Sequence, residues 1–322
     1  MSLGKHSGKS LKLFRTLWGV PFPDKSTQWT SFLKSEVIDK GFEGIECCSP
    51  GPFFSFASDP SALKLVLQES NCKIIFQAHT TDYPVMTSSW AEHAASLRQK
   101  LEQIVALGVS PEVVNVHAGK DSMSTGDIVE FLKAARKSES EVLHQAAVYS
   151  PHLSASSSSL MPCLAFETHR QRMFHSPFQL LDVFKQLPES ERAWLKLNAD
   201  LSHFIVSLER FPTAELDAEF WPHTLRILED HCVYIHARAC SPQAIQIATF
   251  PNSSDDADDD TKAMASWWKR IVEGMRRRNV EVRVCPEYGP PPYQPVDAVT
   301  GKPVGDLDAL VLEGARRLRA QL

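Results

Sequence analysis

Acidic and imidazole side chains stand at or near the carboxyl ends of short apolar runs along this chain. Seven of the eight runs that could form strands carry such a group, and the set is Glu46, His79, His117, Glu167, Asp200, His236 and Glu287. If these ends meet in the fold, several carboxylates at one point would repel one another strongly. A divalent cation is the simplest group that reconciles them, so the pattern predicts a metal centre.

The last four of these runs supply the best ligand set, which is Glu167, Asp200, His236 and Glu287. Three carboxylates and one imidazole favour Mn²⁺, Mg²⁺ or Co²⁺, with Zn²⁺ as a further candidate. We expect one divalent ion, most simply Mn²⁺. Such a site leaves coordination positions open for two oxygens of a substrate.

The remaining strand-end groups are candidate substrate contacts. His203 follows Asp200 by three residues, so it either reaches the pocket wall or caps the following loop. His79 and His117 could contact substrate, hold a second metal ion or serve the structure alone. Glu46, on the second run, joins them as a candidate contact.

Arginines follow the fifth and seventh runs. Arg170 and Arg172 follow Glu167 by three and five residues, and Arg238 follows His236 by two. Guanidinium groups suit carboxylate and phosphate, so these residues predict an anionic or polyhydroxyl substrate. The alternative is that they pair with the acidic segment 252–260, which we interpret as a solvated loop.

The order of elements along the chain predicts how these groups are positioned. Strand-like runs alternate with helical stretches, and the runs are 11–18, 44–48, 73–79, 113–117, 163–167, 194–198, 233–236 and 280–285. Eight strands alternating with eight helices predict an α/β protein that forms a single (β/α)₈ TIM barrel. A doubly wound open sheet is the alternative, but its dinucleotide fingerprint is missing. In a barrel, chemistry takes place where the strands end.

The helical stretches are 88–107, 126–147, 177–185, 213–230, 263–278 and 306–322. We expect one barrel domain over residues 11–322, preceded by a disordered tail at 1–10. A serine-rich stretch at 150–159 and the aspartate-rich segment 252–260 are predicted insertions in loops.

Composition narrows the class of protein. The 322 residues carry a net charge of -5, which argues against a nucleic-acid partner. No apolar run is long enough to cross a bilayer, and the first twelve residues lack the apolar core of a signal peptide. The seven cysteines are scattered, as expected for reduced thiols in the cytoplasm.

Several strings resemble the xylose isomerase-like TIM barrel superfamily. They are Glu167-Thr-His-Arg170, Asp200-Leu-Ser-His203, Ile235-His-Ala-Arg238 and Pro286-Glu-Tyr-Gly-Pro-Pro-Pro-Tyr293. They are similar to a subgroup described as sugar phosphate isomerase/epimerase, and the superfamily also contains abasic-site endonucleases (AP endonuclease family 2). The resemblance implies that the four predicted ligands bind the metal, that Glu167 and Glu287 move a proton, and that His203 touches the substrate. Arg238 departs from the pattern, because family epimerases often carry their arginine further from the histidine.

The resulting expectation is a metal-dependent isomerase or epimerase of a small sugar, sugar phosphate or sugar acid. It would transfer a proton α to a carbonyl through a metal-stabilised enediolate. A dehydratase acting on a polyol ketone would use the same enolate. A phosphodiesterase or abasic-site endonuclease is a further alternative, but that branch uses an Asp-x-His pair that occurs nowhere in this chain. A barrel that only binds its ligand also remains open, as does a homodimer.

Overall fold

The structure is a computed structural model that describes residues 10–21, 23, 26–49, 60–81, 88–149, 163–213, 215–248 and 259–322. The predicted tail at 1–10 lies outside the described residues except for Ser10, and so does the serine-rich stretch 150–159. Of the aspartate-rich segment, only Asp259 and Asp260 are described, and they begin a helix.

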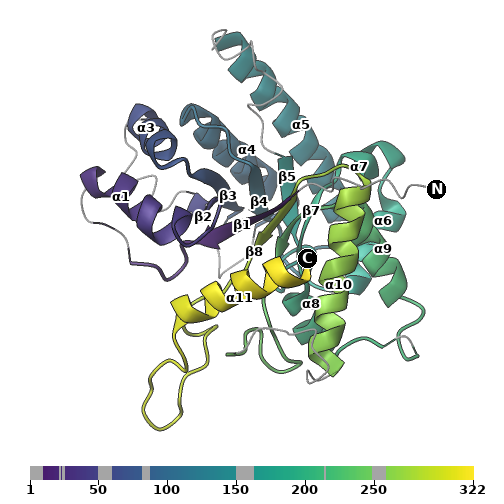
Figure 1. Cartoon of the computed structure of the whole chain (residues 1–322). Coiled ribbons are helices and arrows are strands. Elements are labelled where there is room, and N and C mark those ends of the chain that lie inside the picture. The colour runs from purple at the N-terminus through teal and green to yellow at the C-terminus, as the bar shows by residue number, and fades with distance from the viewer. Residues whose placement is uncertain are drawn as a thin grey trace, which may run out of the picture.

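Eight parallel strands close into a barrel in chain order, which confirms the predicted (β/α)₈ architecture (Figure 1). Closure is made by β1 and β8, where Leu11 pairs with Val282 and Leu13 with Val284. The open-sheet alternative is therefore wrong. The strands are β1 Leu11–Thr16, β2 Gly44–Ser49, β3 Lys73–His79, β4 Val113–His117, β5 Cys163–Glu167, β6 Leu197–Asp200, β7 Cys232–His236 and β8 Val282–Cys285.

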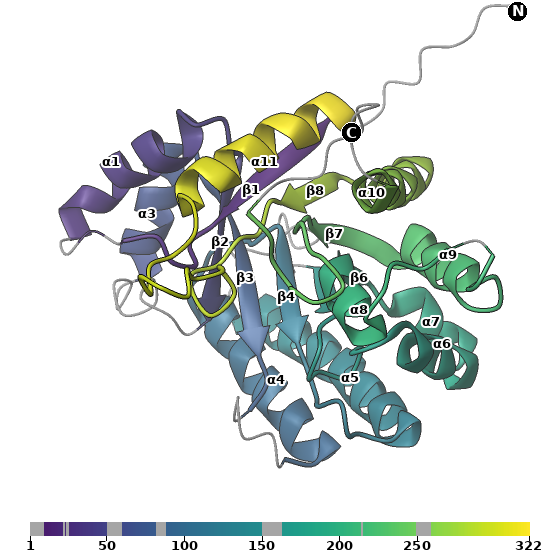
Figure 2. The same ribbon diagram turned by 90° about the horizontal axis from the view of Figure 1, so that it is seen from below.

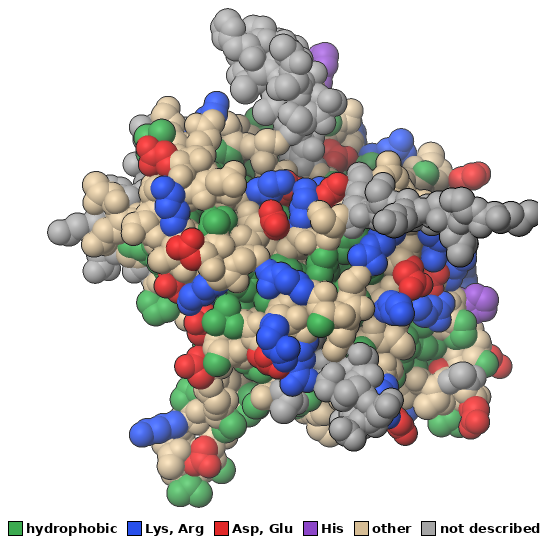
Figure 3. Space-filling view, viewed as in Figure 1, with side chains coloured by type: hydrophobic (Ala, Val, Ile, Leu, Met, Phe, Trp, Pro, Cys, Tyr) green, Lys and Arg blue, Asp and Glu red, His purple; other side chains and the backbone are tan. Residues whose placement is uncertain are grey.

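Helices surround the strands on the outside of the barrel (Figure 2). They are α1 Trp29–Leu33, which continues into the π-helical turn η2 Lys34–Ile38, then α3 Pro60–Ser70, α4 Trp90–Ala106, α5 Thr125–Tyr149, α6 Pro177–Gln186, α7 Glu189–Trp194, α8 Leu201–Leu208, α9 Trp221–His231, α10 Asp259–Arg277 and α11 Leu307–Gln321. Among the described residues, none of these helices is both long and apolar enough to cross a membrane. On the face shown in Figure 3, basic and acidic side chains are interspersed.

Two predicted boundaries are wrong. The sixth strand was expected at 194–198, but Trp194 ends α7 and β6 runs from Leu197 to Asp200. Glu189 and Glu191 in the first turn of α7 favour the helix, because they complement its dipole. The helix expected from residue 213 begins only at Trp221, with Pro222 in its first turn.

The barrel interior is divided into an apolar layer and a polar layer. The apolar cluster is built from six strands and consists of Phe14, Ile75, Val113, Ala165, Val233, Tyr234 and Cys285. A much larger cluster fills the space between strands and helices. Because side chains alternate along a strand, the inward positions nearest the strand ends are left for polar groups.

Gly274 allows α10 to pack closely against α9. A Cβ at this position would lie 2.4 Å from the backbone oxygen of Glu229. We therefore expect Gly274→Ala to lower the free energy of unfolding by about 1–3 kcal/mol, the usual cost of overpacking. The matched control is Gly126→Ala, whose nearest neighbour would be Ser124 Oγ at 3.8 Å.

The control should be neutral or stabilising by up to about 1 kcal/mol, because alanine favours a helix over glycine. Denaturant unfolding of both variants measures the difference. Equal stability of the two variants would contradict the close packing of α9 and α10.

Candidate metal centre

The barrel brings the four predicted metal ligands together. Glu167, Asp200 and His236 end β5, β6 and β7, and Glu287 lies two residues beyond β8. All four side chains are buried. One ligand atom from each lies within 4.8 Å of those from the other three. The last four strands thus bring groups between residues 167 and 287 of the sequence into a single cluster.

The donor set fits a divalent cation. His236 Nδ1 is buried and has no hydrogen-bond partner among the described residues, yet it lies 3.0 Å from Glu287 Oε2 and 3.4 Å from Glu167 Oε2. Glu167 Oε1 is also buried without a hydrogen-bond partner in this part of the chain. Buried polar atoms normally have a partner. A cation between the imidazole and the carboxylates would satisfy both orphaned atoms.

Glu46 orients the histidine of the cluster. His236 Nε2 donates toward Glu46 Oε1 and Oε2, at 2.9 and 3.0 Å. This contact leaves Nδ1 to face the other carboxylates. Glu46 is fully buried beneath the histidine and does not line the cavity, so the structure places it away from the predicted substrate-contact position. A carboxylate behind a metal-binding imidazole fixes the ring and raises its basicity.

Glu46→Gln should weaken metal binding by about 10–100-fold, the usual effect of losing such a partner of a histidine ligand. Isothermal titration of the metal-stripped protein with Mn²⁺ measures the change. The control is Glu139→Gln, because Glu139 is a partly buried carboxylate on α5 that accepts from Trp194 Nε1 at 2.6 Å. An affinity equal to that of the control would remove Glu46 from the metal centre.

Asp200 is fixed by the start of α8. Its Oδ1 accepts from Ser202 N at 2.9 Å, which makes Asp200 the N-cap of the helix. Its backbone is held by Thr168, whose hydroxyl accepts from Asp200 N and donates to Asp200 O, both at 2.9 Å. The Oδ2 atom is left to face the cluster and lies 3.1 Å from Arg238 Nη2.

Two asparagines that the sequence did not single out position Glu167. Asn115 Nδ2 and Asn198 Nδ2 donate to Glu167 Oε2 at 2.6 and 3.2 Å. His117 Nε2 lies 3.0 Å from the same oxygen. A signal was available, because Asn115 and Asn198 each stand two residues before a predicted site residue and so face the same side of the strand.

The three carboxyl groups of the cluster have different pKa values. Burial opposes the charge on Glu287, but Arg238 and His236 outweigh it and bring its pKa to about 2. Burial also opposes the charge on Glu167, yet the neighbouring histidines hold its pKa well below the usual range. Burial raises the pKa of Asp200 to about 6, although Arg238 acts in the opposite direction. Both glutamates are therefore ionised at neutral pH.

The same field favours the protonated form of His236. Burial alone would lower its pKa, but the carboxylates of Glu287, Glu46 and Glu167 raise the pKa well above the usual range. A cation bound at Nδ1 would displace that proton, so metal affinity should increase with pH.

A cavity of about 220 Å³ opens beside the cluster. Its lining includes three predicted substrate residues, His79, His117 and Arg238, and both glutamates Glu167 and Glu287. The lining also includes Arg172, one of the arginines expected near the substrate. The sequence-based prediction did not include the other lining residues, which are Trp18, Cys48, Gln77, His169 and Tyr293. Most of the lining residues that were not predicted are aromatic or basic side chains in loops beyond the strand ends.

The other two predicted contacts lie outside the lining. His203 is fully buried, with its ring 3.8 Å from that of His169 and its Nε2 3.6 Å from Asp200 Oδ2. Arg170 lies over the ring of Tyr293, with its Cζ 5.2 Å from the ring centroid. Arg170 therefore packs on Tyr293 of the cavity lining, and His203 packs on His169 and lies next to the candidate ligand Asp200.

Three imidazoles form a second group beside Glu167. The rings of His79 and His117 stack 4.2 Å apart, and the ligand atoms of His117, Glu167 and His169 lie within 4.8 Å of one another. Burial lowers the pKa of His169 to about 3 and that of His79 well below the usual range, with His117 adding to the latter effect. The uncharged rings of His79 and His169 could hold a second cation or donate to substrate oxygens.

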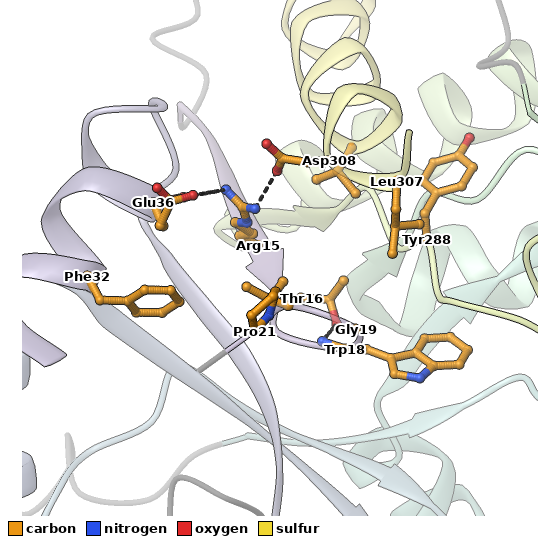
Figure 4. Close-up of a pocket in the computed structure, with 12 residues that line it drawn as sticks. Arg15, Thr16, Trp18, Gly19, Pro21, Phe32, Glu36, Tyr288, Leu307 and Asp308 are labelled. Carbon is orange, nitrogen blue, oxygen red and sulfur yellow. Dashed lines mark hydrogen bonds and ion pairs between the residues drawn. The ribbon is translucent and has the colours of Figure 1, made fainter. Parts of the chain in front are cut away.

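A larger cavity, of about 420 Å³, lies between β1, α1 and α11 (Figure 4). Its charged groups pair with one another, because Arg15 forms ion pairs with Asp308 and with the carboxylate of Glu36, the latter at 3.7 Å. Trp18 lines both cavities. Without a converging set of unpaired groups, this larger cavity is less suited to chemistry than the smaller one.

No family model and no curated protein matches the sequence. Solved structures do resemble the fold. A structure of L-ribulose 3-epimerase has a TM-score of 0.59 at 14% identity, covering 97% of this chain and 94% of that one. The probable 3-DHS dehydratase AsbF from Bacillus anthracis, involved in petrobactin synthesis, has a TM-score of 0.55 at 13% identity, covering 96% and 98%.

A xylose isomerase-like TIM barrel protein from Mycobacterium smegmatis, in complex with magnesium, has a TM-score of 0.53 at 13% identity and covers 98% of this chain and 96% of that one. At these identities the likeness concerns the fold, which agrees with the closed barrel found here. The chain has the fold of the xylose isomerase-like TIM barrels.

Proposed function

We propose that the protein is a divalent-metal-dependent isomerase or epimerase of a small sugar, sugar phosphate or sugar acid. One observation carries the proposal: two ionised glutamates, Glu167 and Glu287, reach the same cluster from β5 and from the loop after β8 and line one cavity. Proton transfer α to a carbonyl needs one carboxylate as a base and a second carboxyl group that takes up a proton from water and acts as the acid.

Each side chain has a defined task in this proposal. A divalent cation held by Glu167, Asp200, His236 and Glu287 would supply a Lewis acid next to the substrate oxygens. One glutamate removes the proton from the carbon next to the carbonyl. The other glutamate, after taking up a proton from water, returns that proton to the opposite face of the carbon or to its neighbour, and the first glutamate releases its proton to water. The first outcome is epimerisation and the second is isomerisation.

The cavity walls favour a small polar substrate. Trp18 and Tyr293 meet edge to face, with ring centroids 4.8 Å apart, at the wall that also carries Arg238. Buried Arg172 and the histidines of the lining supply hydrogen-bond donors at the other polar positions. Donors and aromatic faces together suit hydroxyl groups on a compact carbon skeleton, with or without an anionic group.

Proton exchange with solvent tests the proposal. Ketoses, aldoses, sugar phosphates and sugar acids are incubated with the protein and Mn²⁺ in deuterated water, and deuterium incorporation next to the carbonyl is followed by NMR. We expect at least one compound to exchange, and a chelator to stop the exchange. Failure of every class of compound with fully metal-loaded protein would contradict the proposal.

The same experiment separates a dehydratase from an isomerase. The dehydratase alternative is favoured by the structural similarity to the probable 3-DHS dehydratase. A lyase would also exchange the α-proton, but its product would lack the elements of water. Mass spectrometry of the product distinguishes the two reactions.

The number of bound metal ions tests the endonuclease alternative. An endonuclease of the kind considered above would need three metal ions, so a single ion per chain would contradict that alternative.

All seven cysteines are free, as they would be in a reducing compartment such as the cytoplasm.

A further inference from the structure

Arg238 lies inside the proposed metal centre. It follows His236 by two residues and only 2% of its surface is exposed. Its Nε and Nη2 donate to Asp200 Oδ2 at 3.3 and 3.1 Å, and Nη2 also donates to Glu287 Oε2. A protein cation therefore contacts two of the four candidate ligands.

The guanidinium and a metal ion would need the same oxygens. Asp200 Oδ1 already accepts hydrogen bonds from the backbone and hydroxyl groups of Ser202, so Oδ2 is the oxygen left for any cation. Glu287 Oε2, the other atom that Arg238 contacts, is the oxygen that lies 3.0 Å from His236 Nδ1. Both shared oxygens face the centre of the cluster.

Arg238 also has a second environment within reach. Its Cζ lies 4.9 Å from the ring centroid of Tyr293 and 5.8 Å from that of Trp18, and both rings line the substrate cavity. Its Nη1 is buried without a hydrogen-bond partner among the described residues. The side chain can therefore leave the carboxylates while remaining against an aromatic wall that attracts cations.

We propose that Arg238 is an internal counter-cation that competes with the metal ion for Asp200 and Glu287. Metal binding displaces its Nη2 edge from the two carboxylates and turns the guanidinium toward Trp18, Tyr293 and the substrate cavity. Arg238 thus lowers the affinity of the site for the metal and presents a donor to the substrate only when the metal is bound. The inference rests on the metal site of the proposed function but not on the reaction.

The test compares two arginines that flank Tyr293. Arg238→Gln removes the cation that contacts Asp200 and Glu287. Arg170→Gln removes the other cation that lies over the ring of Tyr293. Metal-stripped protein is titrated with Mn²⁺ by calorimetry, with free Mn²⁺ followed by electron paramagnetic resonance. We expect Arg238→Gln to bind Mn²⁺ at least about tenfold more tightly than the unmodified protein, a usual size for coupled sites.

Arg170→Gln should change the affinity by less than about threefold, because the contribution of a partly exposed charge is small. Unchanged or weaker Mn²⁺ binding by Arg238→Gln would overturn the proposal, since it would mean that the arginine organises the ligands instead of competing for them. If the stripped variant does not fold, the metal-loaded form is titrated with a chelator, and tighter retention of Mn²⁺ is the expected result.

Trp18 provides a second measurement that does not depend on activity. Mg²⁺, which does not quench fluorescence by paramagnetism, is added to the stripped protein and to its Trp18→Phe variant, and the difference gives the emission of Trp18. We expect Mg²⁺ to change this emission in the unmodified protein and not on the Arg238→Gln background. An equal response on both backgrounds would contradict movement of Arg238. Absence of turnover on every sugar, with these metal effects intact, would contradict the proposed function alone.

Discussion

Glu287→Gln is expected to lower turnover by about 10²–10⁴-fold while leaving the fold intact, which is the usual contribution of a general acid or base. The amide has nearly the shape of the carboxylate but can neither accept the substrate proton nor carry the negative charge. Arg238 loses a charged partner at the same time. Steady-state kinetics on the substrate found by proton exchange, together with thermal unfolding, measures both effects.

The matched control for this variant is Glu281→Gln, the same substitution just before β8 at its opposite end. Glu281 pairs with Lys12 Nζ at 2.8 Å and is partly exposed, so its loss should cost less than about 1 kcal/mol of stability and no activity. Turnover by Glu287→Gln equal to that of the control would remove Glu287 from the mechanism. A variant that loses interconversion of two epimers but still exchanges the α-proton of one of them would identify the face on which Glu167 acts.

Removal of the metal is expected to lower turnover by at least about 10³-fold, because a Lewis acid contributes several kcal/mol and each 1.36 kcal/mol is a factor of ten in rate. Added Mn²⁺ should restore the lost activity. The stripped protein should stay folded, since Arg238 and His236 lie among the carboxylates and offset part of their repulsion. Saturation with Mn²⁺ at 100 times its dissociation constant should then add about 2.7 kcal/mol of stability.

The measurement pairs turnover and melting temperature with elemental analysis of the same samples. Full activity in a sample shown to contain no divalent metal would contradict the metal centre. A melting temperature that does not respond to Mn²⁺ would contradict binding at the cluster even if activity required the ion elsewhere.

The ligand set was predictable because a parallel barrel brings strand ends together. Glu167, Asp200 and His236 end successive strands, and Glu167 and His236 each close a short continuous apolar run, as is usual for parallel strands buried on both faces. Glu287 was predicted from its place just after the eighth apolar run, and the proline-rich string around it also resembles a known subgroup. The boundary of β6 was not predictable from apolar pattern alone, because Trp194 packs as well from a helix as from a strand.

The supporting residues were harder to predict, for physical reasons. The strand positions of Asn115 and Asn198 indicate that they face the site, but an uncharged side chain does not reveal that it binds a carboxylate. Glu46 could be placed on an inward-facing strand position, but its contact with His236 depends on the distance across the barrel. Trp18 and Tyr293 lie in loops, where sequence periodicity carries no information about direction.

The bond between Glu46 and His236 joins residues 190 positions apart, from strands on different parts of the barrel wall. Neither half of the chain holds both partners, so a fragment ending after β4 would carry the orienting acid without the imidazole. Metal binding at the cluster can therefore be used to follow closure of the barrel during refolding. High-affinity binding of the ion should appear only after the last strands have joined the sheet.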